Sequence, residues 1–192
     1  MRRQQFLELS PIEGSNFERD YSFVDYRGKV VLDIGADYGT TAAYFLRRGA
    51  VRVVAVEGDE QYFSLLQENA EEVPEVTPVN CRISSPKQLE DLITTYQPDI
   101  LKADCEGCEL HLLNVPDRIL RKVPEYLLEV HNTELWERFR RKFQALGYTI
   151  THVDLWTTQL FEFATGIGEV RIVHAMPTQL LFNKRIKEME VC

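Results

Sequence analysis

The chain has 192 residues, of which 44% are hydrophobic and 27% are charged, and this balance is typical of one folded α/β domain rather than a disordered chain. Lys and Arg total 22 against 30 Asp and Glu, so the formal net charge of -8 disfavours general binding to nucleic-acid backbones. No apolar run approaches the roughly 20 residues that span a bilayer, and the basic residues 1–5 precede no apolar core. We therefore expect a cytoplasmic protein with no membrane contact.

Short β-branched runs alternate with helical stretches along the chain. Residues 1–26 form an aromatic leader, which we expect to pack on the core or over a ligand site, ahead of a single domain at residues 27–192. The apolar runs predict strands at residues 30–34, 51–57, 76–81, 99–104, 125–131, 148–155 and 178–182. The three- and four-residue spacings predict helices at residues 40–48, 59–72, 86–96 and 134–146, with a broken helix over 109–120 around Pro116.

Repeated strand–helix units indicate an α/β fold, a parallel sheet covered by helices on both faces. The last two predicted strands leave no room for a helix of ordinary length between them, so they indicate an antiparallel hairpin at one edge. In the helix over 59–72, we expect Asp59 to be the N-cap. The spacing in that helix predicts one shared face for a set of four residues: Tyr62, Leu65, Leu66 and Asn69.

The end of the first predicted strand and the turn after it hold two glycines and two carboxylates. Gly35 and Gly39 allow a sharp turn and the close approach of a ligand. A dinucleotide fingerprint would have glycine where Asp37 stands, and a carboxylate there would repel a pyrophosphate. Asp37 instead suits a positively charged ligand, such as the sulfonium or ammonium group of S-adenosylmethionine. A nicotinamide-dependent enzyme is therefore disfavoured.

Polar residues also stand at the ends of the second and third predicted strands. Glu57 stands 24 positions after Asp33, close to the spacing at which an acidic residue accepts hydrogen bonds from a ribose diol. The other interpretation of Glu57 is a surface carboxylate. Asn80, beside Cys81, could contact an adenine edge or could be an ordinary turn asparagine.

Three carboxylates fall within six residues after the fourth predicted strand, at Asp104, Glu106 and Glu109. Such crowding raises the pKa of a carboxyl group unless a cation or hydrogen-bond donors compensate, so Asp104 or Glu106 could act as a general base. The alternative is a solvated acidic loop. His131, after the fifth strand, titrates near neutral pH and could serve the same site or be structural.

Two further patterns leave alternatives open. Cys105 and Cys108 form a C-x-x-C, which could be a redox pair, half a zinc site or simply two small residues beside a crowded turn. No convincing set of metal ligands can be identified. The basic run at residues 137–142 favours the solvated face of a helix, with a nucleic-acid patch as the alternative.

Three ordered segments resemble the FkbM-type S-adenosylmethionine-dependent methyltransferases: residues 31–39, 54–59 and 101–109. The resemblance covers about residues 28 to 150. It implies a seven-stranded Rossmann-like fold with an antiparallel last strand, a methionine site at Gly35 to Gly39, a ribose contact at Glu57 and an adenine site at Asn80 and its neighbours. The expected cofactor-binding residues are Asp33, Gly35, Ala36, Asp37, Tyr38, Gly39, Glu57, Gly58, Asn80, Cys81 and Asp104.

The sequence thus predicts an S-adenosylmethionine-dependent methyltransferase in which Asp104, Glu106 or His131 accepts a proton. The resemblance implies O-methylation of a hydroxyl group on a small molecule or sugar. Two alternatives remain: a non-catalytic module that binds the cofactor, and a nucleic-acid methyltransferase that uses the patch at 138–142. The sequence leaves the acceptor and the oligomeric state open, a homodimer included.

Overall fold

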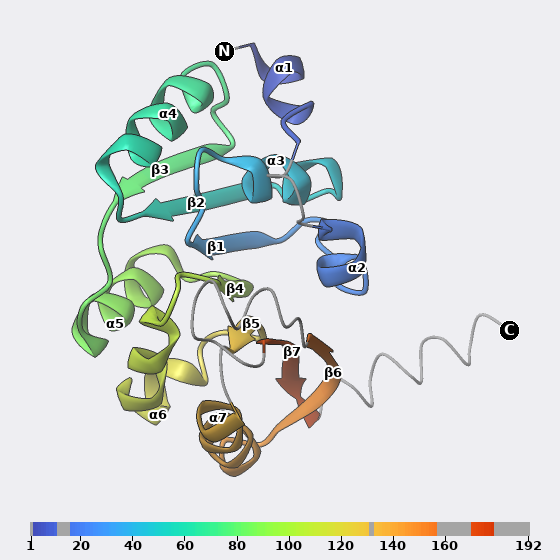
Figure 1. Ribbon diagram of the computed structural model, residues 1–192, viewed down its shortest axis with the longest axis vertical. Helices are drawn as coiled ribbons and strands as arrows, with labels where there is room; N and C mark the ends of the chain where they lie inside the picture. The colour runs from blue at the N-terminus through green and yellow to red at the C-terminus, as the bar shows by residue number, and fades with distance from the viewer. Residues whose placement is uncertain (1, 11–15, 131–132, 157–169, 179–192) are drawn as a thin grey trace, which may run out of the picture.

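The computed structural model describes residues 2–10, 16–130, 133–156 and 170–178 (Figure 1). Within these residues, seven strands form one sheet in the order β3-β2-β1-β4-β5-β7-β6. The strands are β1 (Val30–Ile34), β2 (Arg52–Glu57), β3 (Val76–Asn80), β4 (Ile100–Ala103), β5 (Glu125–Val130), β6 (Tyr148–Trp156) and β7 (Val170–Pro177). Neighbouring strands among β1 to β5 pair in parallel, whereas β7 runs antiparallel to both β5 and β6. The predicted fold, with its edge hairpin, is confirmed.

The central strands are continuous apolar runs because both of their faces are buried. Successive side chains of β1 enter opposite cores, with Val31 in one and Leu32 in the other. The register places Asp33 of β1 directly beside Lys102 of β4. This pairing brings two charged residues together on one face of the sheet, close to the carboxyl ends of both strands.

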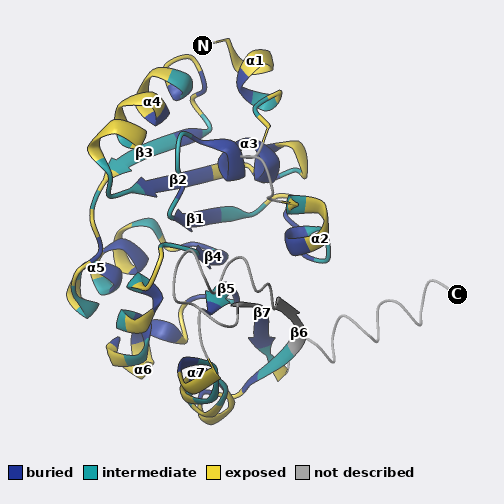
Figure 2. Cartoon of the chain, in the orientation of Figure 1, coloured by how far each residue is buried: buried dark blue, intermediate teal, exposed yellow. Residues whose placement is uncertain are grey.

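Helices cover both faces of the sheet, and most have a buried inner side and an exposed outer side, whereas α3 is buried over most of its length (Figure 2). One face packs against α1 (Arg3–Leu7), α2 (Phe17–Tyr21), α3 (Thr40–Arg47) and α4 (Glu60–Ala70). The other packs against α5 (Pro86–Tyr96), η1 (Cys108–Asn114), α6 (Asp117–Leu120) and α7 (Thr133–Ala145). The predicted break around Pro116 is confirmed, since η1 is a 3₁₀ helix and α6 starts at Asp117. Over the described ranges, every helix is too short or too polar to cross a bilayer.

The position predicted for the last strand is wrong. We expected it at residues 178–182, but the strand is Val170–Pro177, and residues 179–182 lie outside the described ranges. The strand was missed because it is central and buried on both faces, so its apolar residues do not alternate with polar ones. Ile172 enters one core and Val173 the other, while buried His174 interrupts the apolar run.

The predicted face of α4 is also wrong in part. Tyr62 and Leu65 are 44% and 47% exposed, whereas Leu66 and Ala70 are buried. The inward side of the helix is therefore centred on Leu66. The Asp59 cap is confirmed, because its carboxylate accepts hydrogen bonds from two amides of the first turn.

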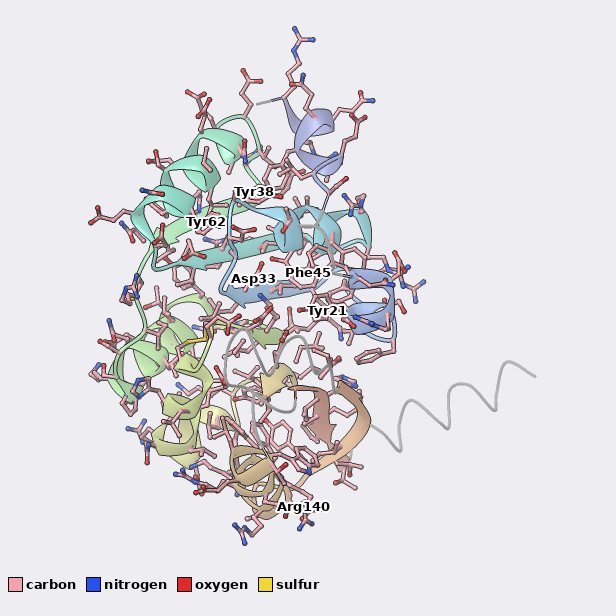
Figure 3. All side chains as sticks on the ribbon, in the orientation of Figure 1. Tyr21, Asp33, Tyr38, Phe45, Tyr62 and Arg140 are labelled. Atoms are coloured by element: carbon pink, nitrogen blue, oxygen red, sulfur yellow. A yellow bond between two sulfur atoms is a disulfide. The ribbon has the colours of Figure 1, made fainter. Side chains whose placement is uncertain are left out.

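Aromatic residues of the first 26 positions pack against α3 and the sheet. Phe6, Tyr21 and Tyr26 are buried in the same core as Phe45 of α3. The Tyr26 and Phe45 rings stack with centroids 4.9 Å apart. Figure 3 shows Tyr21 beside Phe45 on this side of the sheet. This segment is therefore built into the core, close to the loop that follows β1.

Candidate functional site

A cleft of about 690 Å³ opens at the carboxyl ends of β1, β2, β3 and β4. Ligands of open α/β sheets bind at this edge. Its walls come from the loop after β1, the loop after β2, the segment after β3 and the turn after β4. The lining residues are Phe17, Ile34, Gly35, Asp37, Thr40, Thr41, Val56, Glu57, Gly58, Asp59, Tyr62, Cys81, Arg82, Ile83, Ser84, Lys102, Asp104, Cys105, Glu106, Gly107, Cys108 and His111.

The loop after β1 depends on one glycine. Gly35 has a φ of +80°, and a Cβ atom at this position would lie 1.7 Å from the carbonyl oxygen of Asp104. Any other residue would therefore force the loops after β1 and β4 apart. Behind the loop, the Asn69 amide donates a hydrogen bond to the Tyr38 carbonyl, 2.9 Å away. A Cβ at Gly39 would lie 3.0 Å from the Phe6 ring, so the first helix closes the back of this loop.

A buried lysine ties the loops after β1 and β4 together. Lys102 Nζ lies 3.1 Å from Asp33 Oδ1 and 3.8 Å from Asp104 Oδ2. It also donates a hydrogen bond to the Gly35 carbonyl, 2.8 Å away. Burial alone lowers the pKa of Lys102, but the two carboxylates outweigh it, so the pKa is raised and the ammonium stays charged. Thr41 donates a 2.6 Å hydrogen bond to the second oxygen of Asp33.

Asp37 carries an unsatisfied carboxylate oxygen in this cleft. Its Oδ1 atom is buried and has no hydrogen-bond partner among the residues that the structure describes. Its backbone has a φ of 52°, in the left-handed region that non-glycine residues rarely adopt. Burial, with the nearby Glu57 carboxylate, raises the pKa of Asp37 to about 6. A buried acceptor of this kind is costly unless a ligand supplies the missing donor.

Glu57 is held in place by three backbone amides. The amides of Gly58 and Asp59 donate hydrogen bonds to Oε1 at 2.7 and 2.8 Å, and the Asp37 amide donates to Oε2 at 2.9 Å. An ionised carboxylate has about four lone-pair positions. Glu57 therefore keeps about one acceptor position for a ligand hydroxyl, and its orientation is fixed before a ligand binds.

The opposite wall is the turn between β4 and η1. Cys105 and Cys108 are joined by a disulfide. Glu109 is buried, and its carboxylate accepts a 2.9 Å hydrogen bond from the Gly107 amide. Residues three apart share a side of a 3₁₀ helix, so His111 lines the cleft together with Cys108.

The structure brings most of the predicted site residues to one place. Gly35, Asp37, Glu57, Gly58, Cys81, Asp104 and Glu106 all line the cleft. Four other residues that were predicted to bind the cofactor are not among the lining residues: Asp33, Ala36, Tyr38 and Gly39. Asn80 is exposed at the end of β3 and does not line the cleft, where Cys81 and Ile83 are found instead. His131 lies outside the described residues, so its role stays a prediction.

Several lining residues were missed from the sequence. Arg82 and His111 reach the cleft from segments whose position depends on tertiary packing. Phe17 was not missed in this way, because it belongs to the leader that was expected to pack on the core or over a ligand site. The i, i+3 spacing of Cys108 and His111 was the available signal, but only if the segment is known to be a 3₁₀ helix. Over the described ranges, no three His, Cys, Asp or Glu side chains are grouped to hold a metal ion.

Two viral proteins are similar in sequence. Uncharacterized protein 158B of Sulfolobus islandicus rod-shaped virus 1 is 30% identical over 128 residues, which cover 66% of this chain and 76% of that protein. Uncharacterized protein 65 of Sulfolobus islandicus filamentous virus is 30% identical over 143 residues, covering 72% and 82%. The chain belongs to the family of these viral proteins. No protein-family model matches it, so the FkbM-type resemblance stays a prediction.

Several solved structures share the fold of this chain at low sequence identity. A candidate RNA methyltransferase from Pyrococcus horikoshii has a TM-score of 0.60 at 17% identity, covering 91% of this chain and 96% of that chain. A candidate tRNA methyltransferase from Streptococcus pneumoniae, in complex with S-adenosyl-L-methionine, has a TM-score of 0.58 at 17% identity, covering 84% and 71%. Aeropyrum pernix fibrillarin, with natively bound S-adenosyl-L-methionine, scores 0.55 at 18% identity, covering 80% and 69%. The fold is thus Rossmann-like, as in methyltransferases.

Proposed function

We propose that this protein is an S-adenosylmethionine-dependent methyltransferase. The observation that carries the proposal is Asp37, whose buried Oδ1 lacks a partner among the described residues inside a cleft at the carboxyl edge of the sheet. A cationic ligand group supplies a positive charge opposite this carboxylate, and an ammonium group also supplies the missing hydrogen-bond donor. S-adenosylmethionine carries both an ammonium and a sulfonium group, whereas a dinucleotide would bring an anionic pyrophosphate to the same loop.

The other walls of the cleft fit the rest of this cofactor. Glu57, fixed by three amides, keeps an acceptor position for one ribose hydroxyl. The partly apolar segment at Cys81 and Ile83 provides a surface for the adenine ring. The fold neighbours with bound S-adenosyl-L-methionine support the choice of cofactor.

When bound, S-adenosylmethionine supplies an electrophilic methyl group on a sulfonium sulfur. The protein's task is to hold an acceptor oxygen in line with that methyl carbon and to accept the acceptor's proton. We assign the proton to Asp104, because its carboxylate lines the cleft at the end of β4 and Lys102 anchors it. Glu106 and His111 lie on the same wall and are the other candidates for this role.

The charge of the cleft favours a neutral or cationic acceptor. Its lining has two cations, the ammonium of Lys102 and the guanidinium of Arg82. Five carboxylates oppose them: Asp37, Glu57, Asp59, Asp104 and Glu106. Lys102 is already paired with Asp33. An acidic cleft repels phosphate groups, so we propose a hydroxyl group of a small molecule or sugar as the acceptor.

RNA is the second candidate acceptor, and the fold neighbours described as RNA or tRNA methyltransferases favour it. Of the four cations in the basic run on α7, Arg138 and Arg141 are exposed, whereas the other two are paired within the fold. Arg140 pairs with Glu137, and Lys142 pairs with Asp117. Figure 3 shows Arg140 at the end of the molecule opposite Tyr38 and Tyr62.

The test is methyl transfer from S-adenosylmethionine labelled in its methyl group, with total RNA and a small-molecule extract offered as acceptors in parallel. We expect label in the small-molecule fraction, and a loss of about 10²- to 10⁴-fold in kcat for Asp104→Asn if this residue is the base. The matched control is Asp117→Asn on α6, outside the cleft, which leaves transfer unchanged. If the label appears in RNA, RNA and not a small molecule is the acceptor. If calorimetry detects no binding of S-adenosylmethionine, the proposed methyltransferase function is refuted.

A further inference from the structure

The wall that carries the proposed base also carries the disulfide between Cys105 and Cys108, visible as the yellow sulfur–sulfur bond in Figure 3. Both cysteines line the cleft and are partly exposed, and the two residues between them are exposed. A small thiol reagent can therefore reach the sulfur atoms from solvent. The proposed methyl transfer makes no use of this bond.

The disulfide closes a loop whose backbone is unfavourable. Glu106 has a φ of 54°, and the adjacent Gly107 has a φ of 107°. The left-handed region is disfavoured for a residue with a side chain because Cβ crowds the following carbonyl oxygen. A covalent bond across the two residues holds Glu106 in this conformation. Breaking the bond lets the loop relax to other conformations.

The reduced form of the loop has a hydrogen-bond partner ready. The Oε2 atom of buried Glu109 lies 3.8 Å from Cys105 Sγ, the sulfur-to-oxygen distance of a thiol hydrogen bond. In the disulfide form this oxygen accepts the hydrogen bond from the Gly107 amide. A Cys105 thiol could donate to the same oxygen, so both redox states leave the buried carboxylate with a partner.

Movement of this loop would shift residues on both sides of the cleft. A Cβ on Gly35 would lie 1.7 Å from the Asp104 carbonyl oxygen and 3.3 Å from Cys105 Cα, so the loop backbone touches the proposed cofactor loop. At the other end, Cys108 is the first residue of η1, which carries His111. The disulfide therefore lies between the proposed methionine site and the wall that an acceptor would contact.

We propose that Cys105 and Cys108 form a redox-active pair that orders the cleft wall at residues 104–111 when oxidised and releases it when reduced by a dithiol. A thiolate of the reductant attacks one sulfur, the bond between Cys105 and Cys108 breaks, and a mixed disulfide forms. The second thiol of the reductant then displaces the cysteine. Two electrons and two protons pass to the pair, which ends as two thiols, while the reductant ends as a cyclic disulfide.

The test combines intact-mass counting of alkylated thiols with hydrogen exchange, on the full chain before and after dithiothreitol. Because one disulfide joins Cys105 and Cys108, we expect two more alkylated positions after reduction than before it. We expect reduction to speed exchange over residues 104–114 about tenfold, and to leave the β2 segment unchanged. Removal of dithiothreitol in air restores both values.

We expect the double variant Cys105→Ser, Cys108→Ser to show the exchange pattern of the reduced protein without a reductant. If this variant does not fold, the comparison of oxidised and reduced wild-type protein still tests the proposal. Cys81→Ser is the matched control, because this cysteine lines the same cleft as a free thiol and its loss leaves exchange over 104–114 unchanged. Four alkylated thiols before reduction, or equal exchange in both forms, overturns the proposal. These readouts need no cofactor, so they are separate from the failure of methyl transfer.

Discussion

At the scale of a single residue, Asp37 links the cleft to pH. Its pKa is raised to about 6 in the free protein. A bound cation favours the ionised carboxylate and lowers that pKa, so ligand binding releases a proton wherever Asp37 is protonated beforehand. Binding therefore requires the charged form, which predominates above pH 6 and is lost as the pH falls below it.

We expect the affinity for S-adenosylmethionine to be constant above about pH 7 and to fall by up to about tenfold per pH unit below pH 6. Titration calorimetry at pH 7.5, 6.0 and 5.0 measures this. Asp37→Asn should bind more weakly at pH 7.5 and lose the dependence below pH 6, because an amide does not titrate. A variant that keeps the wild-type pH profile would show that another group causes it.

At the scale of an element, helix α4 starts beside the cleft, and the side chain of Asp59 caps its N-terminus. Asp59 Oδ1 accepts hydrogen bonds from the amides of Gln61 and Tyr62, at 2.9 and 3.2 Å. Asp59→Ala should lower the free energy of unfolding by about 1 kcal/mol, as for loss of a helix N-cap. Ser85→Ala is the matched control, because Ser85 precedes α5 without capping a backbone amide. Urea denaturation measures the free energy of unfolding of both variants. Equal losses of this free energy in the two variants would contradict the role of the Asp59 cap.

Elements with a strong local signal were predictable. The bounds of β1 and α5 agree with the prediction, because a buried β-branched run and a proline at the first helical position are local features. The strand β7 was misplaced because its burial depends on partners on both sides. The site followed the same division. Gly35 and Glu57 were predictable from strand ends, whereas Arg82 and His111 reach the cleft only through tertiary packing.

At the scale of the whole molecule, one buried carboxylate joins three strands at the amino-terminal side of the parallel sheet. Glu125, the first residue of β5, pairs with Lys29 just before β1. It also lies 3.3 Å from His174 Nε2 of β7. Burial alone would raise the pKa of Glu125, but the hydrogen bonds from His174 and Lys29 outweigh it and hold the pKa below its usual value.

A lowered pKa makes this network stabilising above the ordinary glutamate pKa. The contribution is fully present there and is lost as the pH falls through the lower pKa of the folded protein. Glu125→Gln should lower the free energy of unfolding at pH 7 by about 2 kcal/mol, the value of hydrogen bonds to a charged group. Thermal denaturation from pH 7 to pH 3 should show a smaller loss of stability in the variant than in wild type. If stability falls equally with pH in the variant and in wild type, Glu125 does not contribute to the loss of stability in acid.

The position of β7 sets an order of events during synthesis. In the sheet, β6 is joined to β5 only through β7, although β6 leaves the ribosome first. Until Val170–Pro177 emerges, β6 has no partner strand in this sheet, and the edge of β5 exposes unpaired amides and carbonyls. An open strand edge is a template for pairing with another nascent chain. During the interval between the synthesis of β5 and that of β7, the chain therefore carries an open strand edge that can pair with another chain.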